Sequence, residues 1–200
     1  MKKLSLFISL LIFTVYSCKT PSNSTSNSTS TIEKPTNAEI KKVKSFNKEL
    51  VWHTDINKAF LISKKENKPL FLFFTGSDWC GWCIRLQKEV FKTPEFDTWA
   101  KDKVVLVELD FPKKTVQSDE LKNQNMQLQQ FFAVRGYPTV WFAKSGLPVE
   151  GKTSFEQLGS TGYVAGGPSK WLEGANQIIS KFVPYTKEEV KAAKKAAKKV

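Results

Sequence analysis

The chain has 200 residues, of which 40% are hydrophobic and 12% aromatic. This composition supplies a core for one globular domain with extensions and excludes a wholly disordered chain. Its 31 lysine and arginine residues against 19 acidic residues give a formal charge of +12, which favours anionic partners without specifying a fold. Many lysines crowd the two ends of the chain, and we expect no nucleic-acid partner.

Residues 1–17 have the pattern of an export signal. Lys2 and Lys3 precede an apolar run over residues 4–16, which is shorter than the ~20 residues of a membrane-spanning helix. A small residue, Ser17, then precedes Cys18, and the whole segment resembles a bacterial lipoprotein signal. The resemblance implies that Cys18 becomes the lipidated first residue and that the lipid bilayer is a partner through it. A plain secretory signal with an incidental cysteine is the alternative.

Residues 18–45 are dominated by Ser, Thr, Asn, Pro and Lys, and they contain few large apolar residues. Such a segment cannot bury enough surface to offset chain entropy, so we expect a flexible tether. The folded domain is expected over residues 46–185, followed by a basic tail over residues 186–200.

Strand-like and helix-like patterns alternate along the domain. In chain order the expected elements are a helix over 55–67, a strand over 70–74, a helix over 80–91, a helix beginning at 93–94, a strand over 104–109, a helix over 119–132, a strand over 139–142, a turn at 144–146, a strand over 158–167 and a helix over 168–182. This alternation predicts an α/β fold, with a central mixed sheet flanked by helices.

The tail begins with Thr186 and Glu189 at the spacing of a capping box. Beyond them, lysines recur every three or four residues and form a basic stripe opposite alanine and valine. We favour a solvated, fraying helix over a helix that contacts an anionic surface.

Cys80 and Cys83 follow a predicted buried strand and open a predicted helix. The unpaired N–H groups and positive partial charge of a helix N-terminus stabilise a thiolate on Cys80. Cys83 lies one turn further on and can attack a mixed disulfide formed at Cys80. Thiol–disulfide exchange needs this pair of roles, an exposed nucleophile of low pKa and a nearby resolving thiol. If Cys18 carries lipid, the odd count of three cysteines leaves one such pair.

Two other interpretations of the cysteine pair have weaker support in the sequence. A structural metal site needs about four ligands, whereas the chain offers one CxxC and a single histidine, so we predict no metal. A purely structural disulfide remains open. No bound cofactor is expected, because the dithiol pair itself holds the electrons.

Residues 74–83, Phe-Thr-Gly-Ser-Asp-Trp-Cys-Gly-Trp-Cys, resemble the active-site segment of the thioredoxin superfamily. The resemblance is to exported bacterial thioredoxin-like proteins, found as lipoproteins or as domains of disulfide-interchange proteins. It spans about residues 51–182, and residues 134–139 match the segment that leads into the family's cis-proline. It implies a single thioredoxin-fold domain in which Pro138 is cis and lies beside the dithiol. The expected substrate groove is formed by Trp79, Gly81, Trp82, Tyr137 and Pro138.

Three positions depart from the family pattern. The pair Gly81-Trp82 replaces the usual Gly-Pro, and the exposed indole forms either part of a docking surface or a local packing contact. Phe74 occupies the position where many members bury an acid, so water or another group, with Asp78 and Glu89 as candidates, would accept the proton of Cys83. Tyr137 replaces a smaller residue, and its phenol would narrow the groove or donate a hydrogen bond to sulfur.

The resemblance implies a thiol–disulfide oxidoreductase of the bacterial cell envelope, lipid-anchored and facing the periplasm or the cell surface. Reductase or isomerase activity is favoured over oxidase activity. The expected partners are disulfide-containing envelope proteins and a membrane or thioredoxin-type electron donor. The alternatives are a thioredoxin-fold binding or chaperone module with little catalysis, and an adaptor that contacts anionic surfaces through its lysine tail.

Overall fold

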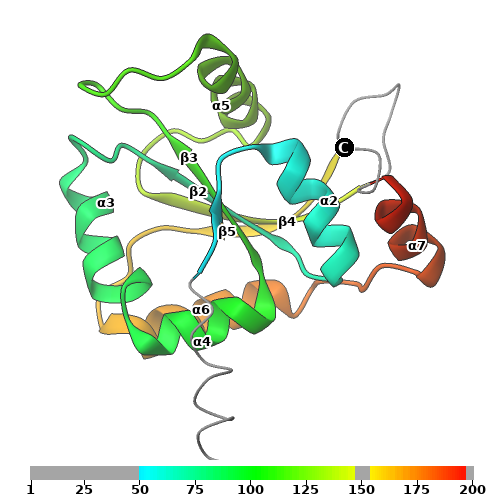
Figure 1. Ribbon diagram of the computed structural model, residues 1–200. Coiled ribbons are helices and arrows are strands. Elements are labelled where there is room, and N and C mark those ends of the chain that lie inside the picture. Colours follow the sequence, from blue (N-terminus) through cyan, green and yellow to red (C-terminus); the bar gives the residue numbers. More distant parts are fainter. Residues whose placement is uncertain (1–49, 147–153, 197–200) are drawn as a thin grey trace, which may run out of the picture. The chain divides into compact units, whose positions relative to one another are not determined.

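A five-stranded mixed sheet lies at the centre of the computed structural model, which describes residues 50–146 and 154–196 (Figure 1). The strands are β1 Trp52–His53, β2 Leu70–Thr75, β3 Val105–Asp110, β4 Thr139–Ser145 and β5 Phe155–Thr161. Their order is β1-β3-β2-β4-β5, with β1, β3 and β2 parallel and with β4 and β5 antiparallel to their neighbours. The sheet confirms the predicted α/β architecture. The export signal, Cys18 and the tether over residues 18–45 lie outside the described residues.

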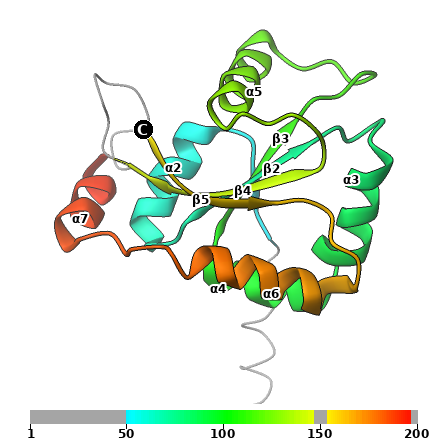
Figure 2. The same ribbon diagram turned by 180° about the vertical axis from the view of Figure 1, so that it is seen from behind.

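Helices cover both faces of this sheet. They are α2 Ile56–Glu66, α3 Gly81–Leu86, the π-helical turn η1 Gln87–Phe91, α4 Pro94–Lys103, α5 Asp119–Phe131, α6 Gly167–Ile179 and α7 Lys187–Ala196. Figures 1 and 2 show α3, α4 and α6 on one face and α2 and α5 on the other. Within residues 50–146 and 154–196, no helix has the length and apolar character needed to cross a bilayer.

Strand β2 is buried along its whole length, as its continuous apolar sequence predicts. Because side chains alternate between the faces of a strand, Phe71 and Phe73 enter the core under α4 and α6. Leu70, Leu72 and Phe74 enter the opposite core, under α2 and α5. The first core is rich in aromatic pairs, such as Phe73 edge-on to Phe91 with ring centroids 5.0 Å apart.

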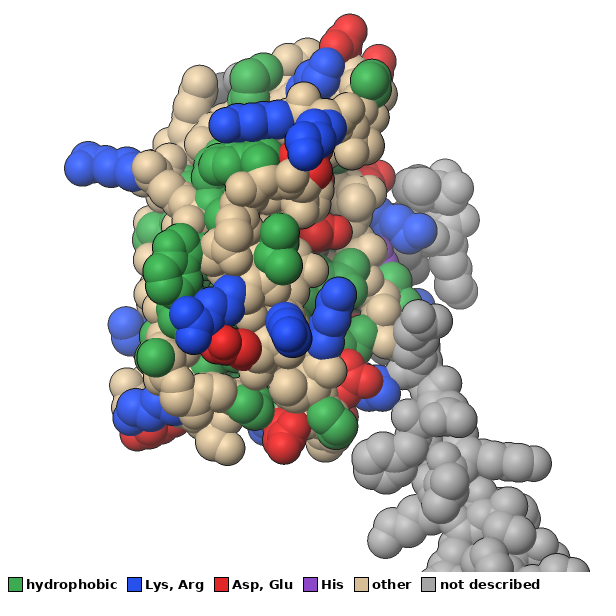
Figure 3. Space-filling view, turned by 90° about the vertical axis from the view of Figure 1, so that its left-hand side faces the viewer, with side chains coloured by type: hydrophobic (Ala, Val, Ile, Leu, Met, Phe, Trp, Pro, Cys, Tyr) green, Lys and Arg blue, Asp and Glu red, His purple; other side chains and the backbone are tan. Residues whose placement is uncertain are grey.

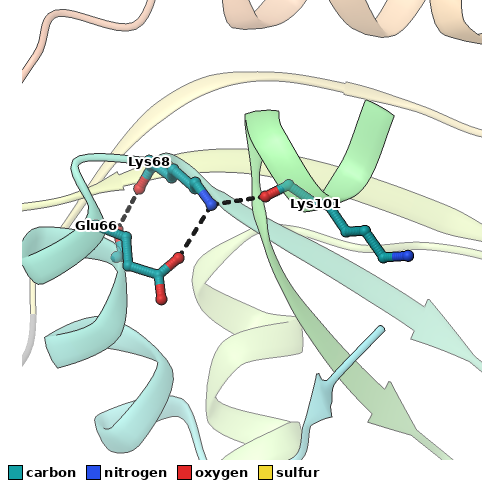
Figure 4. Close-up of polar contacts among 4 residues, drawn as sticks. Glu66, Lys68 and Lys101 are labelled. Carbon is teal, nitrogen blue, oxygen red and sulfur yellow. Dashed lines mark hydrogen bonds and ion pairs between the residues drawn. The ribbon is translucent and has the colours of Figure 1, made fainter. Parts of the chain in front are cut away.

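Local capping residues fix where the helices begin and end. The Asp55 carboxylate accepts hydrogen bonds from the first amides of α2, and Asn67 ends this helix in a left-handed conformation at φ 56°. Thr93 caps α4 and Pro94 occupies its first turn, as predicted. The Lys68 ammonium donates 2.7 Å to the Lys101 carbonyl in the last turn of α4, which ties the α2–β2 connection to that helix (Figure 4).

Several boundaries differ from those predicted. The turn expected at residues 144–146 is wrong, because Lys144 and Ser145 continue β4 and pair with the start of β5. Strand β5 therefore begins earlier than expected, and it ends at Thr161 rather than Gly167. The two-residue strand β1 was not predicted, since it is too short for a periodic pattern.

The helix expected over residues 80–91 is confirmed in position, but its second half is π-helical. The Lys92 amide donates to the Gln87 carbonyl, five residues back, at 2.9 Å. The wider turn brings the consecutive side chains of Val90 and Phe91 into the core.

The C-terminal segment is attached to the domain by a buried tyrosine. The Ser145 amide donates 2.8 Å to the Tyr185 hydroxyl, which also lies 3.0 Å from Ser63 Oγ. The Tyr185 amide donates 2.8 Å to the Asn67 side chain at the end of α2. Beyond it the predicted capping box is formed, and α7 lies against α2 with Lys187, Lys191 and Lys195 exposed to solvent (Figures 1 and 2).

We expect Tyr185→Phe to lower the free energy of unfolding by about 1–3 kcal/mol, because the buried Ser145 amide loses its acceptor. Urea denaturation of the full chain measures the change. Val183→Ala, which alters a side chain that is 61% exposed, is the control and should change stability by less than about 0.5 kcal/mol. Equal stabilities of Tyr185→Phe and the wild type would contradict the anchoring role.

Candidate functional site

The two cysteines lie at the carboxyl end of β2, where the chain turns into α3. Cys80 is the N-cap residue of α3, and its sulfur accepts a hydrogen bond from the Cys83 amide at 3.2 Å. The two residues form a disulfide, with Cα atoms 5.2 Å apart. The turn is fixed by the Gly76 carbonyl, which accepts the Cys80 amide at 2.8 Å. The reactive sulfur therefore lies at a helix N-terminus, where partial positive charge favours a thiolate.

Both sulfur-bearing residues are shielded from solvent in this disulfide form. Cys80 is 6% exposed and Cys83 is fully buried. The expectation of an exposed nucleophile is therefore wrong for the oxidised protein. The indoles of Trp79 and Trp82, each directly before a cysteine in the chain, are 39% and 55% exposed.

Trp79 joins the dithiol turn to the loop that follows β3. Its indole N–H donates 2.7 Å to the Phe111 carbonyl, and its ring lies edge-on to Tyr137 with centroids 5.7 Å apart. A side chain at position 76 would collide with the indole, so Gly76 is required for this packing. The Lys113 ammonium lies 4.2 Å from the centroid of the same ring.

Trp82 belongs to a second cluster, which joins α3 to the loop after β5. Its ring lies 5.1 Å from that of Tyr163, and the Arg85 guanidinium lies over both rings at 5.4 and 5.1 Å. Glu89 accepts 2.6 Å from the Tyr163 hydroxyl and 2.8 Å from Arg85 Nε. The indole thus packs locally on Tyr163 and still presents more than half of its surface to solvent.

The Tyr137–Pro138 peptide bond is cis, as the resemblance implied. The Tyr137 ring lies tilted against Phe111 with centroids 5.3 Å apart, and Gln129 donates 2.7 Å to its hydroxyl. Burial and, secondarily, the charge of Asp110 raise the pKa of the phenol. The hydroxyl is therefore bound to α5, and among the described residues it forms no hydrogen bond with either sulfur atom.

The two acids named as proton acceptors are engaged in other interactions. Asp78 accepts hydrogen bonds from the amides of Lys113, Lys114 and Thr115 at 2.9, 2.7 and 3.1 Å, which lower the pKa of its carboxyl. The hydrogen bond from Tyr163 and then that from Arg85 lower the pKa of Glu89. Both groups hold a proton weakly, so the expectation that either takes the proton of Cys83 is not supported by the geometry.

A different acid, Glu108 on β3, has a raised pKa, whereas the pKa values of Asp78 and Glu89 are lowered. It lies opposite Phe73 in the sheet register and so belongs to the face that carries the dithiol helix. Burial, followed by the nearby charge of Asp110, raises the pKa of Glu108. Thr75, on the same face, has a buried hydroxyl without a hydrogen-bond partner among the described residues. Sequence reasoning missed Glu108, although an acid interrupts an otherwise apolar strand at this position.

The described residues offer no cluster of three or more His, Cys, Asp or Glu side chains that could hold a metal ion. A cavity of about 890 Å³ lies between the start of α2 and the exposed face of α5, where Gln124 bridges the two. None of its lining residues comes from the dithiol turn or the cis-proline loop.

Residues 56–161 match the family described as "Thioredoxin-like domain". Disulfide bond reductase DsbH of Chlamydia pneumoniae is 38% identical over 117 residues, which cover 58% of this chain and 66% of that protein. Thioredoxin-related protein DsbJ of the same organism is 37% identical over 89 residues, which cover 44% of this chain and 26% of that protein. The chain thus spans just under two thirds of one relative and a smaller share of the other.

A solved structure of DsbH oxidoreductase superimposes with a TM-score of 0.61 at 28% identity, covering 78% of this chain and 96% of that chain. This likeness confirms the thioredoxin fold predicted from the sequence.

We expect Asp78→Asn to loosen the loop after β3, because an amide has one acceptor oxygen where the carboxylate uses both. Hydrogen exchange of the Lys113, Lys114 and Thr115 amides should accelerate by about tenfold or more at one or more positions. Asp119→Asn, on exposed α5, is the control and should leave these three amides unchanged. Equal exchange rates in wild type and Asp78→Asn would show that the carboxylate does not hold the loop.

We expect Glu108→Gln to stabilise the protein more at pH 7 than at pH 3. The pKa of Glu108 is raised in the folded state, so its ionisation costs the folded chain more than the unfolded chain. This cost is absent below the unfolded pKa of about 4.3 and fully present above the folded pKa. The quantity measured is the difference in unfolding free energy between variant and wild type at the two pH values.

Glu89→Gln is the control for this experiment, because its stability difference from wild type at pH 7 should have the opposite sign. The lowered pKa of Glu89 contributes stability above the unfolded pKa that is lost as the pH falls through the folded pKa. This variant should therefore lose stability relative to wild type at pH 7 and less at pH 3. The same pH trend in both variants would contradict the assigned environments.

Proposed function

Because this chain belongs to the thioredoxin-like domain family, we propose that it is a thiol–disulfide oxidoreductase that reduces protein disulfides through Cys80 and Cys83. The observation that carries the proposal is the position of the pair, with Cys80 as the N-cap of α3 and Cys83 bonded to it one turn later. The relative named disulfide bond reductase DsbH supports the same direction of electron flow.

The proposed reaction balances without a bound cofactor. The Cys80 thiolate attacks one sulfur of a substrate disulfide, forming a mixed disulfide and releasing the other sulfur as a thiolate that takes a proton from solvent. Cys83 loses its proton and attacks the Cys80 sulfur, which forms the Cys80–Cys83 disulfide and releases the second substrate thiolate. The substrate gains two electrons and two protons in total, and a dithiol or membrane electron donor restores the reduced pair.

The residues around the pair have separate roles in this proposal. Trp79, Gly81 and Trp82 form the surface that a substrate meets, while Tyr137 and Pro138 form the wall beside it. Glu108 is the acid on the dithiol face with a raised pKa, so it replaces Asp78 and Glu89 as the candidate acceptor of the Cys83 proton.

We also propose that the protein works in the bacterial cell envelope on a lipid anchor. The support is the sequence of residues 1–18, which ends in Ser17 and Cys18, and the low-complexity segment over residues 18–45. In this arrangement Cys18 holds the lipid, the tether gives the domain its reach, and the substrates and electron donor are other proteins of the envelope.

The test is reduction of a disulfide-bonded protein by the full chain in detergent, with dithiothreitol as electron source. We expect wild type to accelerate the reduction, and Cys80→Ser to fall to the rate of dithiothreitol alone. Reduced Cys83→Ser, mixed with the substrate after dithiothreitol has been removed, should accumulate a covalent mixed disulfide, because the resolving thiol is absent. If wild type and Cys80→Ser were equally slow, the activity would be refuted, and retained substrate binding would favour a binding module.

The direction of electron flow is tested by the equilibrium reduction potential of the pair. A value near or below about −230 mV supports a reductase, and a value near about −120 mV would identify an oxidant and overturn the stated direction.

A further inference from the structure

The two indoles that neighbour the cysteines in the sequence each lie under a cation. Trp79 and Trp82 are both exposed, and the nearest cationic groups are Lys113, 4.2 Å from the first ring centroid, and Arg85, 5.4 Å from the second. Lys113 belongs to the loop after β3, whereas Arg85 belongs to α3 and also lies over Tyr163 in the loop after β5. A chain segment that approaches the sulfur atoms between the indoles therefore passes close to positive charge from both sides.

The acids near this entrance are bound within the protein. Asp78 accepts three backbone amides, and Asp110 accepts the Ser77 amide at 2.8 Å and the Ser77 hydroxyl at 2.6 Å. Glu89 accepts Tyr163 and Arg85. Their oxygens are directed at internal donors, so these acids offer few acceptor sites to an approaching partner.

The basic side chains at the same face are exposed and mostly lack such partners. We call them the basic rim, which consists of Arg85, Lys88, Lys113, Lys114 and Arg135. Within the described part of the chain, Lys113, Lys114 and Arg135 form no ion pair with an acid, whereas Arg85 pairs with Glu89 and keeps an exposed guanidinium. Arg135 lies three residues before the cis-proline, in the loop that walls the site. Figure 3, which views the side of the molecule carrying α3, shows blue basic groups beside green hydrophobic ones, with red acidic groups between some of them.

We propose that the basic rim selects, as substrates of the activity proposed above, protein segments whose disulfide-bonded cysteine is flanked by acidic residues. The occupant is identified by charge complementarity. Carboxylates on either side of a substrate cysteine meet Lys113 and Arg135 on one side and Arg85 on the other, while the indoles contact its apolar parts. The inference deepens the proposed function and rests on it.

The rim acts mainly on the rate of encounter. Exposed charges interact over a screening length of about 10 Å at 0.1 M salt, which is enough to bias the approach of a charged segment. Steering of this kind raises association rates by about 10- to 1000-fold at low ionic strength and fades as salt is added. The selection should therefore depend on salt, unlike a preference based on shape.

The experiment compares two peptides, each with one internal disulfide, that differ only in having Glu or Lys beside one cysteine. The pre-reduced full chain reduces each peptide, and the readout is the ratio of the two rate constants. We expect the Glu peptide to react about tenfold faster at about 0.01 M salt, and the ratio to fall towards one at about 1 M. Because the same dithiol reduces both peptides, a change in the reactivity of the dithiol alters both rate constants equally and leaves their ratio unchanged.

Two double variants, each of which removes two positive charges, test whether the preference arises at the basic rim. Lys113→Gln with Arg135→Gln should lower the ratio at low salt several-fold. Lys65→Gln with Lys103→Gln should leave the ratio of rate constants unchanged, because Lys65 and Lys103 lie in the last turns of α2 and α4. These turns lie at the end of β2 opposite the dithiol, and this six-residue strand is about 20 Å long.

A ratio near one for wild type at low salt would overturn the inference. An unchanged ratio in the double variant Lys113→Gln with Arg135→Gln would overturn it as well. Neutral 2-hydroxyethyl disulfide separates the two proposals. If the chain reduces it while showing no preference between the peptides, only the inference fails; if the chain reduces neither it nor the peptides, the proposed function fails and the inference with it.

Discussion

The fold depends on one constraint, that strand β2 is buried on both of its faces. Its alternating side chains supply both cores, with Phe71 and Phe73 on one side and Leu70, Leu72 and Phe74 on the other. A strand of this kind needs a helical layer on each face, and the helices on both sides of the sheet provide it. Because β2 is held so firmly, the turn that follows it presents Cys80 and Cys83 at a fixed place.

The site is assembled on that fixed turn from loops that the sheet brings together. Asp78 and Trp79 hold the loop after β3, Tyr137 links it to the cis-proline loop, and Trp82 rests on Tyr163 after β5. Asp78 and Trp79 act through hydrogen bonds with backbone groups of the loop, whereas Tyr137 and Trp82 act through ring contacts. The indoles of Trp79 and Trp82 nevertheless keep exposed surface.

Much of this arrangement could be predicted from the sequence, because it depends on local patterns. The apolar run of β2, the Thr93 cap and the Thr186 capping box are local signals, and the structure contains each of them. The misses depend on long-range contacts. Lys144 and Ser145 have turn-like neighbours but are held in β4 by β5, and the environment of Glu108 follows from its register beside Phe73. The burial of Cys80 in the oxidised form likewise has no signature along the chain.

The Tyr185 anchor has a consequence for where the autonomous folding unit ends. The family match stops at residue 161, yet the fully buried Trp171 and the nearly buried Tyr185 lie beyond it. A fragment cut at the end of the match would expose the aromatic core under α6 and leave the Ser145 amide without its acceptor. The smallest fragment of this chain that can fold on its own thus includes Tyr185. The segment that follows α6 is part of the folded domain and completes its core.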